Sequence, residues 1–354
     1  MLKLTPHPGY SSFIAVFLLV LALMPAAGAN IKPAPSACLQ GTFIQLLDSQ
    51  AAWKESDWKQ LFDYFKMLQL SQMVVQWSMY DNTAFYPSAN FKSSANSPLE
   101  WILQMADEAG MHVMIGLAHD TQYWEKISHG QKEKEAYLST ALARSATVAR
   151  EVEPLARKFR SFQGWYITEE VDDLNWVKPE SSDALFFHLQ QLSTFLHVLT
   201  PGAQIGISGF ANRSTAPEAV EQFWTALLKK SKFISILYFQ DGIGAKKLQL
   251  ENLADYLAAV QKAATLQHRD FQPVIELFQQ TSGYPVNAGQ FEATPATLDR
   301  IFKQTNIANM HAPNHIAFGV PEYATPMGGT AAEKLFNDYV AFMIQKQTKC
   351  DQSD

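Results

Sequence analysis

Two glutamates at the ends of apolar segments are the residues of this chain best suited to acid–base or nucleophilic chemistry. Glu170 ends the segment "GWYITEE", and Glu276 interrupts the apolar run "PVIELF". A carboxylate in such surroundings is costly to desolvate unless it is hydrogen-bonded or works at a wet site. Two carboxyl groups that face each other can cleave a glycosidic bond, because one protonates the departing oxygen while the other attacks the anomeric carbon or activates water.

Both glutamates also have simpler explanations. The segment "EEVDDLNW", which contains Glu169, Glu170, Asp172 and Asp173, is equally typical of a solvated loop. Glu276 is compatible with a buried structural ion pair. We expect the three acidic neighbours of Glu170 to support a site or to face solvent. The choice between these interpretations depends on where the surrounding elements place the side chains.

Apolar runs of about six residues recur along the chain and alternate with segments of helical periodicity. They begin near Gly41, Gln72, Met111, Gln163, Gln204, Phe233, Pro273 and His315. Strands that alternate with helices predict a parallel sheet covered on both faces, and eight such units predict closure into a barrel. The sequence therefore predicts an α/β fold, a single (β/α)8 TIM barrel over residues 41–350.

Helix signals support this alternation. Ser97 and Pro98 predict the start of a helix that ends at Gly110, and Thr294 with Pro295 predicts the start of another. An open doubly wound sheet is the alternative architecture. It normally carries a glycine-rich phosphate turn after its first strand, and "GTFIQLLDSQ" has none.

The chemistry of such a barrel lies at the C-terminal ends of its strands. Because side chains alternate along a strand, Trp165 and Ile167 share one face of the fourth strand and Glu170 lies on the other. We expect the large apolar pair to pack against helices, which leaves Glu170 pointing towards the barrel mouth. On the seventh strand, Glu276 shares a face with Val274.

A site for a glycan should combine polar side chains, which bind hydroxyl groups, with aromatic rings, which pack on the C–H faces of sugars. Strand ends supply both kinds, and the candidate substrate-binding residues are Gln45, Gln76, Trp77, His119, Tyr123, Trp124, Tyr166, Asn212, Tyr238, Gln240, Asp241 and Glu322. Each aromatic residue among them is also compatible with the core. Turn formation is the alternative role of Gln240 and Asp241, because Asp-Gly is a common turn signal.

Other kinds of site lack support. His119 and Asp120 suggest a metal-dependent deacetylase, but "HDTQYW" has no further histidine at helical spacing. Pro313 interrupts the spacing from His311 to His315. The segment "GISGF" is not a G-x-S-x-G nucleophile elbow, and no loop resembles a phosphate cradle. We therefore expect no metal and no cofactor.

The beginning of the chain is typical of a secretory signal. Lys3 precedes an apolar run from Phe13 to Met24, which is too short to span a bilayer, and small residues follow up to Ala29. Cleavage after Ala29 gives a signal peptide over 1–29 and a leader segment over 30–40, and takes the net charge from −6 to −7. An uncleaved anchor is the alternative.

The mature protein is expected to be periplasmic or secreted. It has no second long apolar run and no basic block, so we expect neither a membrane nor a nucleic acid as partner, while the oligomeric state stays open. Cys38 and Cys350 lie near the two ends of the mature chain. In an oxidising compartment we expect them to form one disulfide. Two unpaired thiols, or lipidation of Cys38, are the alternatives.

Strand-end segments of this chain resemble those of an uncharacterised bacterial family of unknown function in the clan of retaining glycoside hydrolases built on (β/α)8 barrels. In order, they are "GTFIQ", "VVQW", "GWYITEEVDD", "YFQDGIG" and "IELFQ", and the resemblance covers nearly the whole mature chain. It implies Glu170 as general acid/base and Glu276 as nucleophile in the hydrolysis of a polysaccharide or oligosaccharide. Well-studied members of the clan have Asn where this chain has Glu169. A non-catalytic glycan-binding barrel that assists exopolysaccharide or envelope-glycan assembly or export is therefore the alternative.

Overall fold

Eight parallel strands close into a barrel in the computed structural model, which describes residues 38–283 and 291–346. In order around the ring they are β1 (Gly41–Ile44), β14 (Ile316–Phe318), β11 (Asp270–Glu276), β10 (Ile236–Gln240), β9 (Gln204–Phe210), β8 (Phe162–Asp172), β6 (His112–Gly116) and β2 (Gln72–Val75). The ring closes because β1 pairs in parallel with both β2 and β14. The predicted α/β barrel is confirmed, and the open sheet is excluded.

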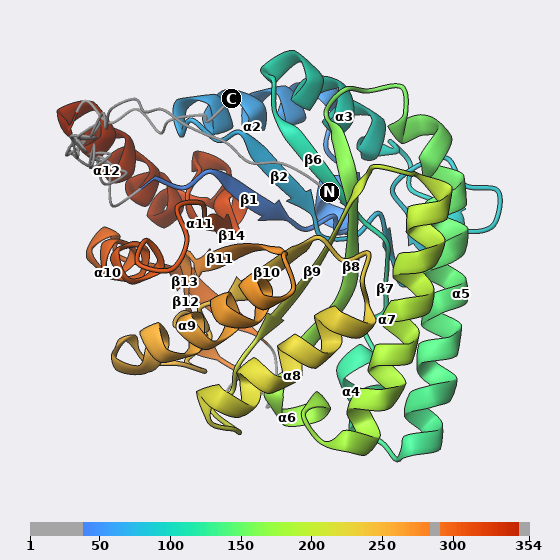
Figure 1. Ribbon diagram of the computed structural model, residues 1–354. Helices are drawn as coiled ribbons and strands as arrows, with labels where there is room; N and C mark the ends of the chain where they lie inside the picture. Colours follow the sequence, from blue (N-terminus) through green and yellow to red (C-terminus); the bar gives the residue numbers. More distant parts are fainter. Residues whose placement is uncertain (1–37, 284–290, 347–354) are drawn as a thin grey trace, which may run out of the picture. The chain divides into compact units, whose positions relative to one another are not determined.

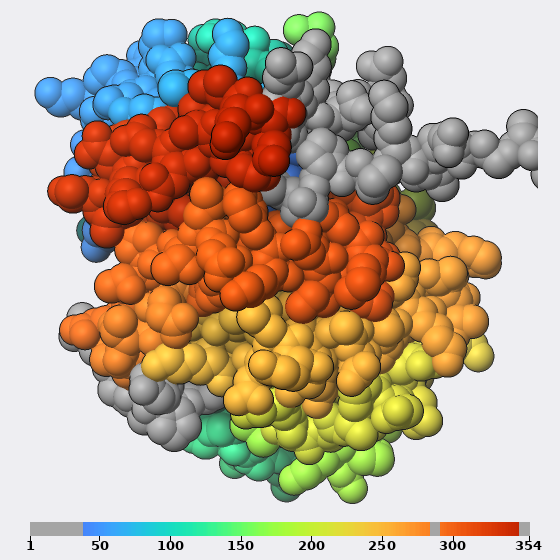
Figure 2. Space-filling view, turned by 90° about the vertical axis from the view of Figure 1, so that its left-hand side faces the viewer, coloured from blue at the N-terminus to red at the C-terminus, as the bar shows by residue number. Residues whose placement is uncertain are grey.

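One long helix follows each barrel strand and packs outside the ring (Figure 1). In chain order these are α2 (Glu55–Met67), α3 (Pro98–Ala109), α5 (Gln131–Ala156), α7 (Pro179–Leu199), α8 (Pro217–Lys230), α9 (Leu250–Leu266), α10 (Leu298–Ala308) and α12 (Thr330–Lys346). Figure 2 shows the face on which α12, in red, lies between α2, in blue, and α10, in orange. Ring contacts join these helices, with centroids 5.3 Å apart for Tyr64 and Phe336 and 4.4 Å apart for Phe302 and Phe342.

Short elements at the C-terminal ends of the barrel strands build a rim above the ring. They are α1 (Asp48–Ala51), β3 (Met79–Tyr80), β4 (Thr83–Ala84), β5 (Lys92–Ser93), β7 (Ala118–His119), α4 (Tyr123–Ser128), α6 (Asp173–Trp176), β12 (Phe278–Ser282), β13 (Glu292–Pro295), α11 (Val320–Tyr323) and the 3-10 turn Pro326–Gly328. β12 and β13 form an antiparallel pair. β3, β4, β5 and β7 form a small separate sheet.

Side-chain alternation along the strands separates two layers of core. Trp165, Ile167 and Ile275 belong to the layer between strands and helices. The interior of the ring is filled by Phe43, Val74, Met114, Tyr166, Ile236, Tyr238, Val274 and Ile316. Both predictions from alternation are confirmed here, since Trp165 and Ile167 face the helices and Val274, on the face of Glu276, lies inside the barrel.

The predicted signal peptide, over residues 1–29, lies outside the described residues, as does most of the leader. No helix in residues 38–283 and 291–346 is long and apolar enough to cross a membrane. Cys38 is buried at the start of the described chain. Its expected partner Cys350 lies outside the described residues, so the disulfide stays a prediction.

Candidate active site

A cavity of about 350 Å³ opens at the C-terminal ends of the barrel strands. It is lined by Gln45, Gln76, Glu170, Gln240, Ala245, Lys247, Glu276, Phe278, Gln280, Gly283, Phe291, Phe318 and Tyr323. Glu170 comes from β8 and Glu276 from the end of β11, with β9 and β10 between them in the ring. The closed ring therefore brings two carboxyl groups, far apart in the sequence, to one cavity.

Glu276 is held by the backbone of the loop after β10. Its Oε2 accepts the N–H of Ala245 at 2.7 Å, and the side chain is only 2% exposed. Burial raises the pKa of Glu276, while the Ala245 N–H and the Lys247 ammonium oppose that rise. Arg300 of α10 donates to the backbone carbonyl of Glu276 at 2.8 Å, which ties the strand end to a helix.

This backbone contact requires a glycine. A Cβ added at Gly244 would lie 2.3 Å from the carbonyl oxygen of Phe278 and 3.0 Å from Oε2 of Glu276. Real Cβ atoms do not approach a backbone oxygen so closely. The segment "DGIG" therefore lets the loop after β10 pass directly beside the Glu276 carboxylate.

Asp241 lies behind Glu276 and is fully buried. It accepts the N–H of Ile243 at 3.1 Å and an N–H of the Gln304 side chain. Burial, and then the negative charge of Glu276, raises the pKa of Asp241 to about 8. We assign the proton to Asp241 and the charge to Glu276, because Glu276 has both the backbone N–H and Lys247 to stabilise its carboxylate.

Glu170 reaches the cavity through an irregularity of β8. The pairing of β8 with β9 jumps from Ile167 opposite Ile207 to Val171 opposite Gly209, so three residues of β8 face one residue of β9. Bulges of this kind re-aim side chains next to active sites. Gln240 donates to Oε1 of Glu170 at 2.6 Å. Burial raises the pKa of Glu170, against the opposing effects of Lys247 and Gln240.

The other acids of this segment turn away from the cavity. Glu169 is 4% exposed and lies outside the ring, with Oε1 3.5 Å from Nε2 of His188 on α7. Asp172 accepts the N–H of Asn175 at 2.9 Å and so caps α6. Asp173 accepts the N–H of Asn212 at 2.7 Å. Asp172 and Asp173 hold the rim in place, as predicted for a supporting role, while Glu169 contacts α7. None of the three is solvated.

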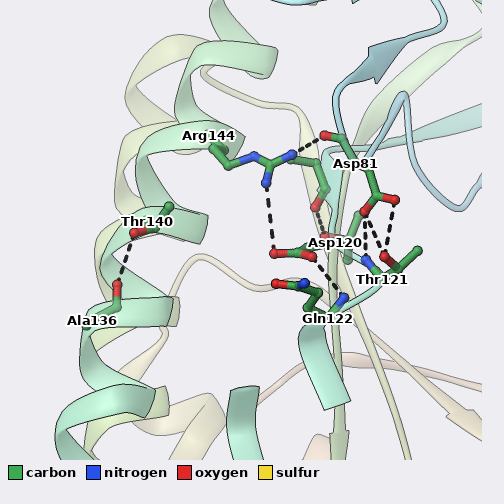
Figure 3. A network of polar contacts seen from close by, with 9 residues as sticks. Asp81, Asp120, Thr121, Gln122, Ala136, Thr140 and Arg144 are labelled. Atoms are coloured by element: carbon green, nitrogen blue, oxygen red, sulfur yellow. Dashed lines mark hydrogen bonds and ion pairs between the residues drawn. The ribbon is translucent and has the colours of Figure 1, made fainter. Parts of the chain in front are cut away.

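A second, smaller niche of about 20 Å³ contains several of the predicted rim residues. His119, Asp120 and Tyr123 line it. Figure 3 shows its polar network, in which Arg144 of α5 donates to the carbonyl of Asp81 and lies 3.9 Å from the Asp120 carboxylate. Within the described ranges no three His, Cys, Asp or Glu side chains form a group that could hold a metal ion.

Of the twelve predicted substrate-binding residues, the structure brings Gln45, Gln76 and Gln240 to the cavity of the two glutamates. Tyr166 and Tyr238 fill the interior of the ring. Trp77 is 4% exposed and stacks on His119, with ring centroids 4.4 Å apart.

The remaining predicted residues lie around these sites. Trp124 packs against Phe210, with ring centroids 5.6 Å apart. Asn212 donates to Asp172 at 2.9 Å and belongs to the loop after β9. Glu322 lies on α11 beside the cavity residue Tyr323, and burial raises its pKa to about 7.

Several lining residues were not among the candidates drawn from the sequence. The most informative is Lys247, which follows the turn segment "YFQDGIG" by three residues. Phe278 ends the predicted run "PVIELF" of the seventh strand, and Gln280 follows it by two residues; in the structure both lie on β12. Continued alternation after Glu276 was the available signal for both, because these residues keep the inward face.

The fold of this chain, a (β/α)8 barrel, is similar to solved structures of low sequence identity. A "putative alpha-L-fucosidase" from Bacteroides thetaiotaomicron has a TM-score of 0.69 and 18% identity, covering 90% of this chain and 98% of that chain. A GH10 protein from Paenibacillus barcinonensis has a TM-score of 0.52 and 13% identity, covering 92% and 100%. A GH18 chitinase from Pseudoalteromonas aurantia has a TM-score of 0.51 and 11% identity, covering 86% and 98%. At these identities the similarity shows the fold alone.

The family follows from the sequence comparison. Residues 39–328 match a domain of unknown function, DUF4434, and the chain belongs to that family. The uncharacterized protein YbcH of Escherichia coli (strain K12) is 25% identical over 251 residues, which cover 70% of this chain and 76% of that protein. The resemblance to an uncharacterised family is thus confirmed.

Proposed function

We propose that this protein is a glycoside hydrolase that acts on a polysaccharide or oligosaccharide through Glu170 and Glu276. The observation that carries the proposal is that both glutamates line one cavity at the C-terminal ends of the barrel strands, on β8 and β11. Active sites of such barrels lie at this end. The glycoside hydrolases among the structural neighbours add support for this class of reaction.

The environments of the two carboxyl groups suit different roles. Glu276 accepts a backbone N–H and, with its charge stabilised, is our choice for the nucleophile. Glu170 has its pKa raised by burial, so it holds a proton at higher pH than an exposed glutamate and is our choice for the general acid. After a glycosyl-enzyme intermediate forms on Glu276, Glu170 would deprotonate the incoming water, and the product would retain its anomeric configuration.

The remainder of the lining fits a sugar. Gln45, Gln76, Gln240 and Gln280 supply amide donors and acceptors for hydroxyl groups, and Phe278, Phe291, Phe318 and Tyr323 supply aromatic surface. Gln45 donates to Gln76 at 2.9 Å, so two of these amides are already oriented before a ligand binds. A mixture of this kind favours a carbohydrate over a purely apolar ligand.

The first test compares the native chain with Glu170→Gln and Glu276→Gln on a panel of glycans, with release of reducing ends as the readout. We expect Glu170→Gln to lower kcat by about 10²- to 10⁴-fold on substrates with poor leaving groups, the usual contribution of a general acid. Glu276→Gln should abolish turnover. The matched control is Glu292→Gln, because Glu292 is exposed on β13 and does not line the cavity. Undiminished turnover by Glu276→Gln would remove the assignment.

A non-catalytic glycan-binding barrel is the second candidate. It is favoured by the Lys247 ammonium, whose charge opposes protonation of Glu170, the proposed general acid. The same panel separates the two functions. Glycan binding by the native chain without release of reducing ends supports the binding protein, whereas release supports the hydrolase.

We further propose that the chain is exported to the periplasm or secreted and loses residues 1–29. The support is the apolar run from Phe13 to Met24 followed by small residues up to Ala29. Intact-mass measurement of protein recovered outside the cytoplasm should find a chain that begins at Asn30. The full-length mass would instead support an uncleaved anchor.

A further inference from the structure

We propose that Lys247 selects substrates that carry an anionic substituent on the sugar, a carboxylate or a sulfate. The inference rests on the proposed function, because the sugar would bind in the cavity of Glu170 and Glu276. It adds the chemical class of the substrate to that proposal.

Lys247 is placed for this role by the loop between β10 and α9. Gly242 adopts a left-handed conformation, with φ of 65°, and its carbonyl accepts the N–H of Lys247 at 2.8 Å. The ammonium lies over the ring of Phe210, 3.1 Å from its centroid. A cation–π contact and a backbone turn therefore hold the side chain at the wall of the cavity before any ligand binds.

The ammonium of Lys247 forms no direct ion pair with the acids around it in the described part of the chain. Glu170, Glu276, Asp172 and Asp173 act on it electrostatically. Within the described part of the chain, however, no carboxylate oxygen lies within 4.0 Å of its Nζ and no hydrogen-bond acceptor is assigned to it. Lysine has three N–H donors. All three are thus left for a ligand in the cavity.

The rest of the lining explains why a ligand for Lys247 should be charged. Among the described lining residues Lys247 is the single cation, whereas four glutamines offer neutral partners to hydroxyl groups. The glutamines can therefore bind the hydroxyl groups of a neutral sugar without Lys247. A half-buried ammonium is best compensated by an anion, because opposite charges attract more strongly where water is partly excluded.

The simplest competing role is that of a counter-ion for Glu276. The distance argues against it, because a direct ion pair would bring Nζ and the carboxylate within 4.0 Å. Glu276 already accepts the N–H of Ala245 at 2.7 Å. Lys247 therefore assists both glutamates only at longer range and keeps its donors for the substrate.

The decisive experiment measures binding in the inactive background Glu276→Gln, by calorimetry, so that turnover is not needed. The probes are uronic-acid oligosaccharides and neutral oligosaccharides of the same length and linkage, with a sulfated set as a third arm. Each is compared with and without Lys247→Met, which keeps an unbranched side chain over Phe210. Lys246→Met is the matched control, because Lys246 is the exposed neighbour of Lys247.

We expect acidic probes to bind at least tenfold more tightly than neutral ones, and Lys247→Met to remove that preference while neutral binding changes less than twofold. Added salt should weaken only the acidic probes. Whether uronate or sulfate binds better identifies the anion. Equal binding of acidic and neutral probes, an equal loss of both in Lys247→Met, or no binding of any probe would overturn the proposal.

The design separates this inference from the proposed hydrolysis. A native chain that prefers acidic glycans through Lys247 but releases no reducing ends would refute the hydrolase and leave the inference standing. Cleavage of neutral glycans without a preference for acidic ones would support the hydrolase and refute the inference about Lys247. A second variant, Lys247→Gln, together with thermal unfolding of both variants, guards against a loss of binding caused by misfolding.

Discussion

Asp241 and Glu276 show how two neighbouring acids acquire different charge states. They lie at the ends of β10 and β11, which pair directly, and both are buried. Repulsion makes it costly for both to ionise. The Lys247 ammonium, together with the Ala245 N–H, stabilises the Glu276 carboxylate, so Asp241 keeps the proton. The proposed nucleophile, Glu276, therefore stays ionised next to an acid that would otherwise be charged at neutral pH.

Asp241→Asn should change how stability depends on pH. The pKa of Asp241 is about 8 in the folded chain, far above its ordinary value of 3.8, so the folded state holds a proton that the unfolded state releases between these values. The free energy of unfolding of the native chain should thus fall, relative to Asp241→Asn, as pH rises from about 5 to 8. Urea unfolding at both pH values measures this.

The control for this prediction is Asp255→Asn. Asp255 is exposed on α9, and its replacement should shift the unfolding free energy equally at both pH values. If Asp241→Asn and the native chain also differ by a constant amount, Asp241 does not carry a proton in the folded state.

At the scale of elements, the C-terminal end of β8 positions both the site and the rim. The irregular pairing after Ile167 brings Glu170 to the cavity, while Glu169 faces α7. Beyond it, Asp172 caps α6 and Asp173 binds the loop after β9. One acid-rich segment therefore supplies a contact to α7, a candidate catalytic group, a helix cap and a loop anchor, which explains why four carboxylates lie so close together.

Asp173→Ala should destabilise the protein by about 2–3 kcal/mol, because it removes three hydrogen bonds to a buried carboxylate. Asp173 is 5% exposed and accepts the N–H groups of Asn212, Ser214 and Thr215 at 2.7, 2.8 and 3.0 Å. Chemical unfolding measures the loss, and hydrogen exchange should quicken over residues 211–216.

The comparison variant for this prediction is Asp183→Ala. Asp183 forms an exposed ion pair with Lys230 at 3.3 Å, so its removal should cost less than about 1 kcal/mol. Similar losses for the two variants would show that the Asp173 contacts do not anchor the loop.

At the scale of the whole ring, closure brings the first strand against strands from the middle of the chain. Phe43 of β1 contacts Tyr166 of β8 and Tyr238 of β10 inside the barrel, with ring centroids 5.4 and 5.5 Å apart. Gly206 of β9 leaves room for this cluster, because a Cβ there would lie 2.7 Å from the Tyr238 ring. The aromatic cluster fills the interior beneath the cavity of the two glutamates.

Phe43→Ala should lower the free energy of unfolding by about 3–5 kcal/mol, since it leaves a cavity that the ring cannot collapse to fill. Phe43 is 2% exposed. Thermal unfolding measures the effect, and Phe187→Ala is the control of the same chemistry, because Phe187 is 64% exposed on α7. A loss for Phe43→Ala as small as that of the control would mean that the interior does not depend on this ring.

Local pattern was enough to predict the barrel strands and the directions of the two glutamates. Each of the eight apolar runs contains or adjoins a barrel strand, and Gly110 ends α3 with a φ of 67°. One local signal was wrong: Thr294 and Pro295 do not open a helix but lie in β13, and α10 begins at Leu298 after a Thr297 cap. Pairing with β12 overrides the capping signal, because hydrogen bonds between strands outweigh a weak local preference.

Which residues line the cavity could be learned only from the closed ring. Alternation along a strand depends only on neighbouring residues, and it puts Glu276 on the inward face. The irregular pairing of β8 after Ile167 brings Glu170 to the same cavity. Whether Trp77 packs in the core, and whether Lys247 lines the cavity, depends on how eight separate loops meet at one end of the barrel. Contacts between these loops join residues far apart in the chain, so no local sequence pattern encodes them. Only the tertiary structure therefore identified Lys247 as the cation behind the proposed selectivity of the cavity.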